Sequence, residues 1–213
     1  MKIKNIKATS IAESLVIMLI VVTWVVWMYR IFSESTKLSN TTKNRIEAIQ
    51  IAREWIEAMT NLRDTNWILY SADNRNCWNT TNYNNNCIWN TGRSTTVGST
   101  DIWPWSYIIY KDSNDRWSIF SKTTGNYNTT VYKNDFKVTK DSDWFYTQTW
   151  WTEFKPVFTR EMKITYPENT NWDSFIDSND EKMKIISLVQ WSDSSSEKAH
   201  KVELETILSN WKN

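Results

Sequence analysis

The stretch IAESLVIMLIVVTWVVWMYRIF, residues 11–32, decides the architecture that we expect of this chain. It is almost entirely apolar, and about 20 helical residues at 1.5 Å each span the roughly 30 Å hydrocarbon core of a bilayer. Residues 1–8 carry three lysines and no acid, which favours a cytoplasmic N-terminus with the rest of the chain outside; Arg30 weakly opposes this orientation. The run is longer than a signal-peptide core and no small-residue cleavage pattern follows it, so we expect it to be retained.

Glu13 is an acid inside this apolar segment. A carboxylate at membrane depth is costly and usually implies a partner. Two interpretations follow: Glu13 lies at the headgroup level of a plain signal anchor, or it pairs with a cation inside a helix bundle.

Helical spacing continues beyond Phe32, because apolar residues recur at steps of mostly three or four and the first proline is Pro104. We expect one long helix from about Ser10 to Arg63, with a transmembrane half at 9–32 and an amphipathic half at 33–64. The alternative is two helices with a break near 39–42, where Ser39 or Asn40 could cap the second. The apolar positions are Leu38, Ile46, Ile49, Ala52, Ile56, Met59 and Leu62.

Residues 7–16, KATSIAESLV, resemble the processing site of type IV prepilins and pseudopilins. In that family a short basic leader is cut off on the cytoplasmic side of the apolar helix, the new N-terminal residue is methylated, and a glutamate occupies the fifth mature position. The resemblance implies a cut between Ala8 and Thr9, which makes residues 1–8 a cleaved leader and puts Glu13 at that fifth position. Ala8 stands where the family usually has Gly, and Thr9 where Phe is commoner.

The resemblance also implies a role for Glu13. The freed amine of one subunit and Glu13 of its neighbour could neutralise each other inside an apolar helix bundle and set the axial register. The chain would then be a structural subunit, major or minor, of a type IV pilus or secretion pseudopilus. Its partners would be copies of itself or related pilin subunits, a prepilin peptidase that cuts after Ala8, the pilus or secretion assembly machinery, and membrane lipid. The alternative is a single-pass membrane-anchored surface domain, an adhesin or sensor, that does not polymerise.

A second resemblance lies in residues 52–67, AREWIEAMTNLRDTNW, which are similar to a block that follows the membrane helix in many bacterial prepilin-like proteins. Those proteins have Gly where this chain has Trp55. The C-terminal stretch from Phe158 to Lys212 resembles the end of the same proteins. The match at both ends supports the family, while the middle of the chain is looser.

The composition is unusual, with 15 Trp and only 3 Gly, although glycine normally makes up roughly 7% of a protein. Some bacteria read UGA as glycine, and their genes show Trp at those positions when UGA is translated as tryptophan. The alternative is a chain that favours Trp for carbohydrate or membrane-interface contact. The positions expected to be glycine are Trp24, Trp27, Trp55, Trp105, Trp144, Trp150 and Trp151, with Trp89, Trp103 and Trp172 as weaker candidates. The expected true tryptophans are Trp67, Trp78, Trp117, Trp191 and Trp211.

From about Trp67 onward the pattern changes to short alternating runs that predict strands. They form an antiparallel sheet packed on the second half of the long helix, an α+β fold with an extracytoplasmic β-rich head domain at 65–213. Residues 121–157 are too polar and irregular to assign. The expected strands are 106–110 and 116–120 around a polar turn at 112–115, 158–166 ending at Pro167, 182–191, and 201–208, with a turn at 192–197.

Candidate chemistry is sparse. The net charge of +1 argues against a nucleic-acid binder, and a single histidine, His200, leaves few ways to build a triad or a multi-histidine metal site. We expect His200 on the surface. An acidic run at 173–181 lacks the EF-hand spacing, so we expect a solvated loop. With no Gly-rich phosphate loop and no nucleophile–base pairing, we expect no enzyme activity, cofactor or metal.

Two cysteines, Cys77 and Cys87, flank a polar tract and would form a disulfide outside the cytoplasm; the alternative is a pair of free thiols. Three N-x-Thr sequons begin at Asn40, Asn79 and Asn128, a pattern that is common by chance in a chain so rich in Asn and Thr.

Overall fold

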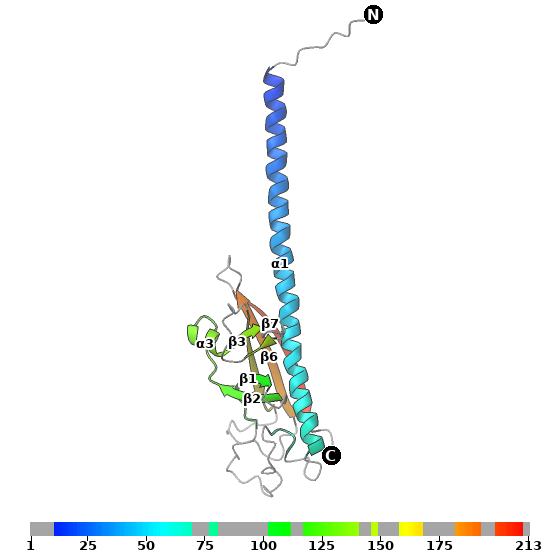
Figure 1. Cartoon of the computed structure of the whole chain (residues 1–213), viewed down its shortest axis with the longest axis vertical. Coiled ribbons are helices and arrows are strands. Elements are labelled where there is room, and N and C mark those ends of the chain that lie inside the picture. Colours follow the sequence, from blue (N-terminus) through cyan, green and yellow to red (C-terminus); the bar gives the residue numbers. More distant parts are fainter. Residues whose placement is uncertain are drawn as a thin grey trace, which may run out of the picture. The chain divides into compact units, whose positions relative to one another are not determined.

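The computed structural model describes residues 11–69, 77–80, 102–111, 117–140, 146–148, 158–167, 182–192 and 199–210. The chain divides into two compact units, Met1–Asn44 and Arg45–Asn213. Helix α1, Ile11–Leu69, is continuous over 59 residues (Figure 1). The expected single long helix is therefore confirmed, and the alternative with a break near 39–42 is wrong. We call the second unit, which includes the last part of α1, the head unit.

The helix continues past Arg63, where we expected it to end, as far as Leu69. Asn66 and Trp67 are buried, and Asn66 Nδ2 donates to the carbonyl oxygens of Trp78 at 3.2 Å and Thr80 at 2.7 Å. These bonds join the last turns of α1 to the segment 77–80, which begins shortly after the helix ends. The expectation that the β pattern begins at about Trp67 is wrong, because Trp67 still lies in α1. The tertiary contact that holds these last turns is not visible in the local sequence.

The described part of the head unit contains a seven-stranded sheet in which every pairing is antiparallel. Strand β5 is central: β1 and β3 pair with successive parts of one of its edges, and β6 pairs with the other. β2 extends the sheet from β1, β4 from β3, and β7 from β6. The elements are β1 Ser106–Lys111, β2 Trp117–Lys122, α3 Thr130–Asp135, β3 Lys137–Lys140, β4 Tyr146–Thr147, β5 Phe158–Thr165, β6 Lys182–Ser192 and β7 Ala199–Ser209.

The expected antiparallel sheet and the α+β class are thus confirmed, with strand ends that differ by a few residues. Helix α3 and strands β3 and β4 lie in the region that the sequence left unassigned. The turns expected at 112–115 and, beyond Ser192, at 193–197 lie outside the described residues.

The core of the head unit lies between α1 and one face of the sheet (Figure 1). The buried stripe of the helix is rotated relative to the expected one: Leu38 is 68% exposed and Ile46 is 54% exposed. Three alanines in the stripe allow the helix to approach the strands closely. Its members are Ala48, Ile51, Ala52, Trp55, Ala58, Met59 and Leu62, and they pack with Met162, Ile164, Met183, Ile185, Val189 and Trp191 of β5 and β6.

Candidate functional site

The first candidate site is the apolar surface of α1 from Ile11 to Phe32, which we call the membrane segment. Its large hydrophobic side chains are exposed, and the helix is long and apolar enough to cross a membrane by length and composition. Apolar patches of this extent on a protein surface mark a membrane or protein contact. A helix that is apolar all round and exposed fits a single-pass membrane anchor.

Glu13 lies near the N-terminal end of the membrane segment and is exposed. The basic residue within the segment, Arg30, is 17 positions further on, or about 25 Å along a helix. The two charges therefore cannot neutralise each other within one chain. The processing residues Ala8 and Thr9 lie outside the described residues, so the expected cut stays a prediction.

Arg160 of β5 connects the sheet to α1 and is almost completely buried. Its Nη1 donates to Glu54 Oε2 at 2.8 Å and to the carbonyl oxygen of Ile51 at 3.3 Å, and its guanidinium lies 4.0 Å from the ring centroid of Trp55. Burial lowers the pKa of Arg160 to about 10, although the carboxylate of Glu54 opposes this shift. Three different contacts thus hold the helix against the sheet at one point.

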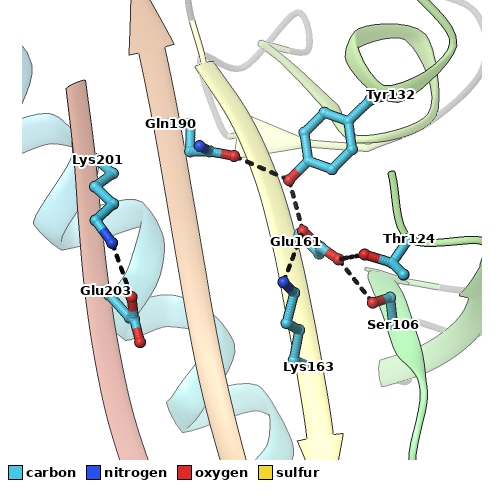
Figure 2. Close-up of polar contacts among 8 residues, drawn as sticks. All are labelled: Ser106, Thr124, Tyr132, Glu161, Lys163, Gln190, Lys201 and Glu203. Carbon is cyan, nitrogen blue, oxygen red and sulfur yellow. Dashed lines mark hydrogen bonds and ion pairs between the residues drawn. The ribbon is translucent and has the colours of Figure 1, made fainter. Parts of the chain in front are cut away.

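The neighbouring residue, Glu161, points to the opposite face of the sheet and is also buried. Figure 2 shows its carboxylate at the centre of a polar cluster, with α1 behind the strands. Ser106 Oγ and Thr124 Oγ1 donate to Oε1 at 2.7 and 2.8 Å, and the Tyr132 hydroxyl donates to Oε2 at 2.6 Å. Lys163 Nζ lies 3.8 Å from Oε2. We call these five residues the Glu161 cluster.

The Glu161 cluster ties together segments that are distant in sequence. Ser106 begins β1, Thr124 follows β2, and Tyr132 lies in α3; its hydroxyl is also 3.1 Å from Gln190 Oε1 of β6 (Figure 2). Burial and the adjacent carboxylate both raise the pKa of Tyr132, so the phenol stays protonated. With three hydroxyl donors and one ammonium group, the charge of Glu161 is well compensated. The arrangement stabilises the fold, since each polar group is already engaged.

A third polar cluster joins the segment 77–80 to Tyr166 and Ile102. Asn79 Nδ2 donates to the Tyr166 hydroxyl at 3.0 Å, and that hydroxyl donates to the carbonyl oxygen of Ile102 at 2.6 Å. Cys77, in the same segment, is completely buried. Its expected partner, Cys87, lies outside the described residues, so the disulfide stays a prediction.

The remaining candidate residues are placed as follows. His200 is half-buried, not on the open surface as expected, because its ring stacks on Trp191 with centroids 5.3 Å apart and planes at 20°. Within the described ranges, no group of three or more His, Cys, Asp or Glu residues could hold a metal ion. The acidic run at 173–181 lies outside those ranges.

Sequence reasoning missed Arg160 and Glu161. Alternation of apolar and polar residues in 158–166 predicts a strand with one apolar face, but Phe158 to Met162 are all buried. Covering elements on both faces bury this strand, and one of them, α3, was not predicted. The available signal was the pair of adjacent opposite charges in the middle of a strand.

The structure describes tryptophans from both expected groups, the glycine positions and the true tryptophans. Among the expected glycine positions, Trp24, Trp27 and Trp105 are exposed, whereas Trp55 is completely buried. The expected true tryptophans that the structure describes are buried or half-buried: Trp67, Trp78, Trp117 and Trp191.

Comparison with known proteins assigns no family to the chain, because no family model, curated protein or solved structure matches it.

Proposed function

We propose that this chain is a pilin-like structural subunit, held in a membrane by its N-terminal helix and assembled through that helix into a filament or pseudopilus. The observation that carries the proposal is the exposed, apolar membrane segment with an acid, Glu13, near its start. The same helix continues into the head unit, where its last part is buried on the sheet. A plain anchor accommodates the acid only at the headgroup level, whereas a helix bundle supplies a partner for it.

Within the part of the chain that the structure describes, the membrane segment offers Glu13 no cation in reach, which supports a partner from another molecule. Arg30 is too far along the helix to reach it, and an unpaired carboxylate in hydrocarbon is costly. Cleavage between Ala8 and Thr9 would create an amine four residues before Glu13. On a neighbouring subunit shifted along the helix axis, that amine would meet the carboxylate, and each charge would have the partner that burial requires.

The head unit has features expected of a structural subunit. Arg160 fixes α1 to the sheet, and the Glu161 cluster fixes three further segments to the opposite face. In this proposal, these contacts keep the head unit folded as one body during assembly. The head is extracytoplasmic, and the other partners are the prepilin peptidase and the assembly machinery.

Processing is tested first, by mass spectrometry of the N-terminal peptide of the protein from its native envelope. We expect a mature chain that begins at methylated Thr9. An intact peptide bond between Ala8 and Thr9 in the assembled fraction would overturn the proposal and leave the non-polymerising surface domain as the function.

Assembly is tested with Glu13→Ala in the full chain, against Glu57→Ala as the matched control, because Glu57 is an exposed glutamate on the same helix but in the head unit. We expect Glu13→Ala to remove the chain from the sheared filament fraction while it stays in the membrane, and Glu57→Ala to assemble normally. Normal assembly of Glu13→Ala would contradict the role of this carboxylate.

We also propose that glycine occupies position 55 in the protein that the cell makes. Among the residues that the structure describes, Trp55 Nε1 and the adjacent Arg160 Nε are buried and have no hydrogen-bond partner, which is costly. Trp191 Nε1 shares this property, so packing alone does not discriminate. The mass of the peptide that contains position 55 decides: a glycine mass there and a tryptophan mass at Trp67 support the recoding, and tryptophan at both positions contradicts it.

A further inference from the structure

The three sequons of the chain differ sharply in their surroundings. Asn79 is completely buried, and its side-chain amide already donates to Tyr166. Asn40 lies within α1, where Thr42, the hydroxyl residue of its sequon, donates to the carbonyl oxygen of Leu38 at 2.9 Å. Neither site presents both an accessible amide and an available hydroxyl in the folded chain.

Asn128 is in a different position, at a corner of the exposed turn 126–129. The turn is closed by a hydrogen bond from Thr129 N to the Asn126 carbonyl oxygen at 2.9 Å, and the backbone N–H of Asn128 donates to Asn126 Oδ1 at 3.0 Å. Asn128 and Thr130 are both exposed, and within the described part of the chain neither side chain has a hydrogen-bond partner. Both side chains of this sequon are thus accessible.

The fold attaches both sides of this turn to the head unit. Thr124 before it and Tyr132 after it donate to the two oxygens of the same carboxylate, Glu161 (Figure 2). The short loop is therefore pinned at its base on both sides. It lies on the face of the sheet opposite to Arg160, whose contacts are with α1.

We propose that Asn128 is an N-glycosylation site, with a polyprenyl-diphosphate-linked oligosaccharide as the sugar donor. Asn128 Nδ2 forms a bond to the anomeric carbon, and the bond between that carbon and the diphosphate oxygen breaks. The polyprenyl diphosphate leaves with the electron pair, and a base of the transferase takes the amide proton. This inference rests on the extracytoplasmic head of the proposed function. The glycan would project from the face that does not carry α1, so it is compatible with assembly through the helix.

The test is glycopeptide mass spectrometry on the full chain from its native envelope, with three variants. Wild type and Thr130→Ser, which keeps the sequon, are expected to carry a sugar mass on Asn128. Thr130→Ala and Asn128→Gln are expected to lose it, since each removes one half of the sequon. An unmodified Asn128 in the wild type, or a glycan that survives Thr130→Ala, overturns the inference.

A topology measurement separates this inference from the proposed function. Lys201 has a side chain that is 67% exposed, and a membrane-impermeant amine reagent applied to intact cells labels it if the head is outside. Labelled Lys201 with unmodified Asn128 overturns the glycosylation site alone. Unlabelled Lys201 in intact cells, with labelling after lysis, overturns the orientation and the glycosylation site together.

Discussion

Two parts of helix α1 have the same backbone conformation but opposite side-chain patterns. In the membrane segment, residues 11–32, apolar side chains surround the helix and are exposed. In the head unit, only one stripe of the helix is buried against the sheet, and Ile46, Ile68 and Leu69 lie outside it and are exposed. A helix that is apolar all round needs a surrounding of lipid or protein, whereas a one-sided helix needs a single partner face. The comparison shows that helical structure is common to both parts and that the environment of the side chains distinguishes them.

The stretch between them belongs to neither pattern. Residues 33–42 are polar apart from Leu38, and threonine side chains there bond back to the helix: Thr36 Oγ1 to Ser33 O, Thr41 Oγ1 to Lys37 O and Thr42 Oγ1 to Leu38 O. Such bonds satisfy the hydroxyl groups within the helix itself.

The largest expected difference between the two parts of α1 is in packing energy. A methionine-to-alanine substitution in each part tests it. Met59→Ala removes a completely buried side chain of the head unit and is expected to lower the free energy of unfolding by about 2–5 kcal/mol. Met18→Ala, in the membrane segment, removes a side chain that contacts no core and is expected to leave this quantity unchanged. Denaturant unfolding of both variants in detergent micelles is the measurement, and equal losses would contradict the comparison.

A second pair of variants tests the membrane segment. Val21→Arg places a charge near the centre of the apolar run, at a cost of about 3 kcal/mol, or roughly a hundredfold in membrane partition. Ile46→Arg makes the same change at an exposed position in the head unit and is expected to have no effect on partition. Alkaline extraction of membranes separates integrated from released protein. If Val21→Arg stays integrated as well as Ile46→Arg does, residues 11–32 are not the anchor.

The predicted disulfide concerns the head unit alone. Cys77→Ser and Cys87→Ser are each expected to lower the free energy of unfolding of the head unit by about 2–3 kcal/mol, since the bridge constrains the unfolded chain. A reducing agent is expected to lower the stability of the wild type by a similar amount and to leave the variants unchanged. Labelling of both cysteines by a thiol reagent in the unreduced, unfolded protein would contradict the pairing.

The smallest predicted effect is on the response to alkali. Burial raises the pKa of Tyr107 to about 12, from an ordinary value near 10, so between these pH values the unfolded chain loses a proton that the folded chain keeps. This tyrosine therefore contributes a loss of stability of about 1.4 kcal/mol per pH unit as the pH rises through that window. Arg160 acts in the opposite direction, because with a lowered pKa of about 10 the folded chain releases that proton first.

The difference between wild type and Tyr107→Phe isolates the tyrosine, since Arg160 is common to both. We expect the unfolding free energy of Tyr107→Phe to fall less steeply between pH 10 and 12. Membrane partition, which depends on the other part of the helix, is expected to stay constant. Parallel pH profiles of the two proteins would show that Tyr107 ionises equally in the folded and unfolded chains.

Much of the fold could be predicted because its signals are local. Continuous apolar spacing predicted α1, and alternation predicted β1, β2, β5, β6 and β7. Helix α3 and the short strands β3 and β4 were not predicted, since they are polar and short and are held by contacts elsewhere. Tyr132 bonds to Glu161, and Gln148 Nε2 donates to the carbonyl oxygens of Phe136 and Arg160. The rotation of the buried stripe on α1 was also missed, because several overlapping stripes fit helical spacing and only the sheet selects one.

The candidate sites likewise divide into those that local sequence reveals and those that depend on contacts between distant segments. Glu13 stands out in the sequence because a charge within an apolar run is conspicuous without any knowledge of the fold. The Arg160 and Glu161 contacts depend on residues that are distant along the chain, since Arg160 is 106 positions from Glu54 and Glu161 is 55 from Ser106. The three sequons have the same sequence pattern, but Asn79 is buried in the structure whereas Asn128 is exposed.

By itself, therefore, the sequence determined which segment is apolar enough to span a bilayer and which segments alternate as strands. Whether a run is apolar, or alternates between apolar and polar residues, depends only on residues that are adjacent in the sequence, so these properties can be read from a short segment. Only the tertiary structure decided where α1 ends, which of its faces is buried, and which charges and sequons are enclosed. Those properties depend on contacts between segments that only folding brings together, and the free energy of burying a polar group depends on whether such a contact supplies its partner.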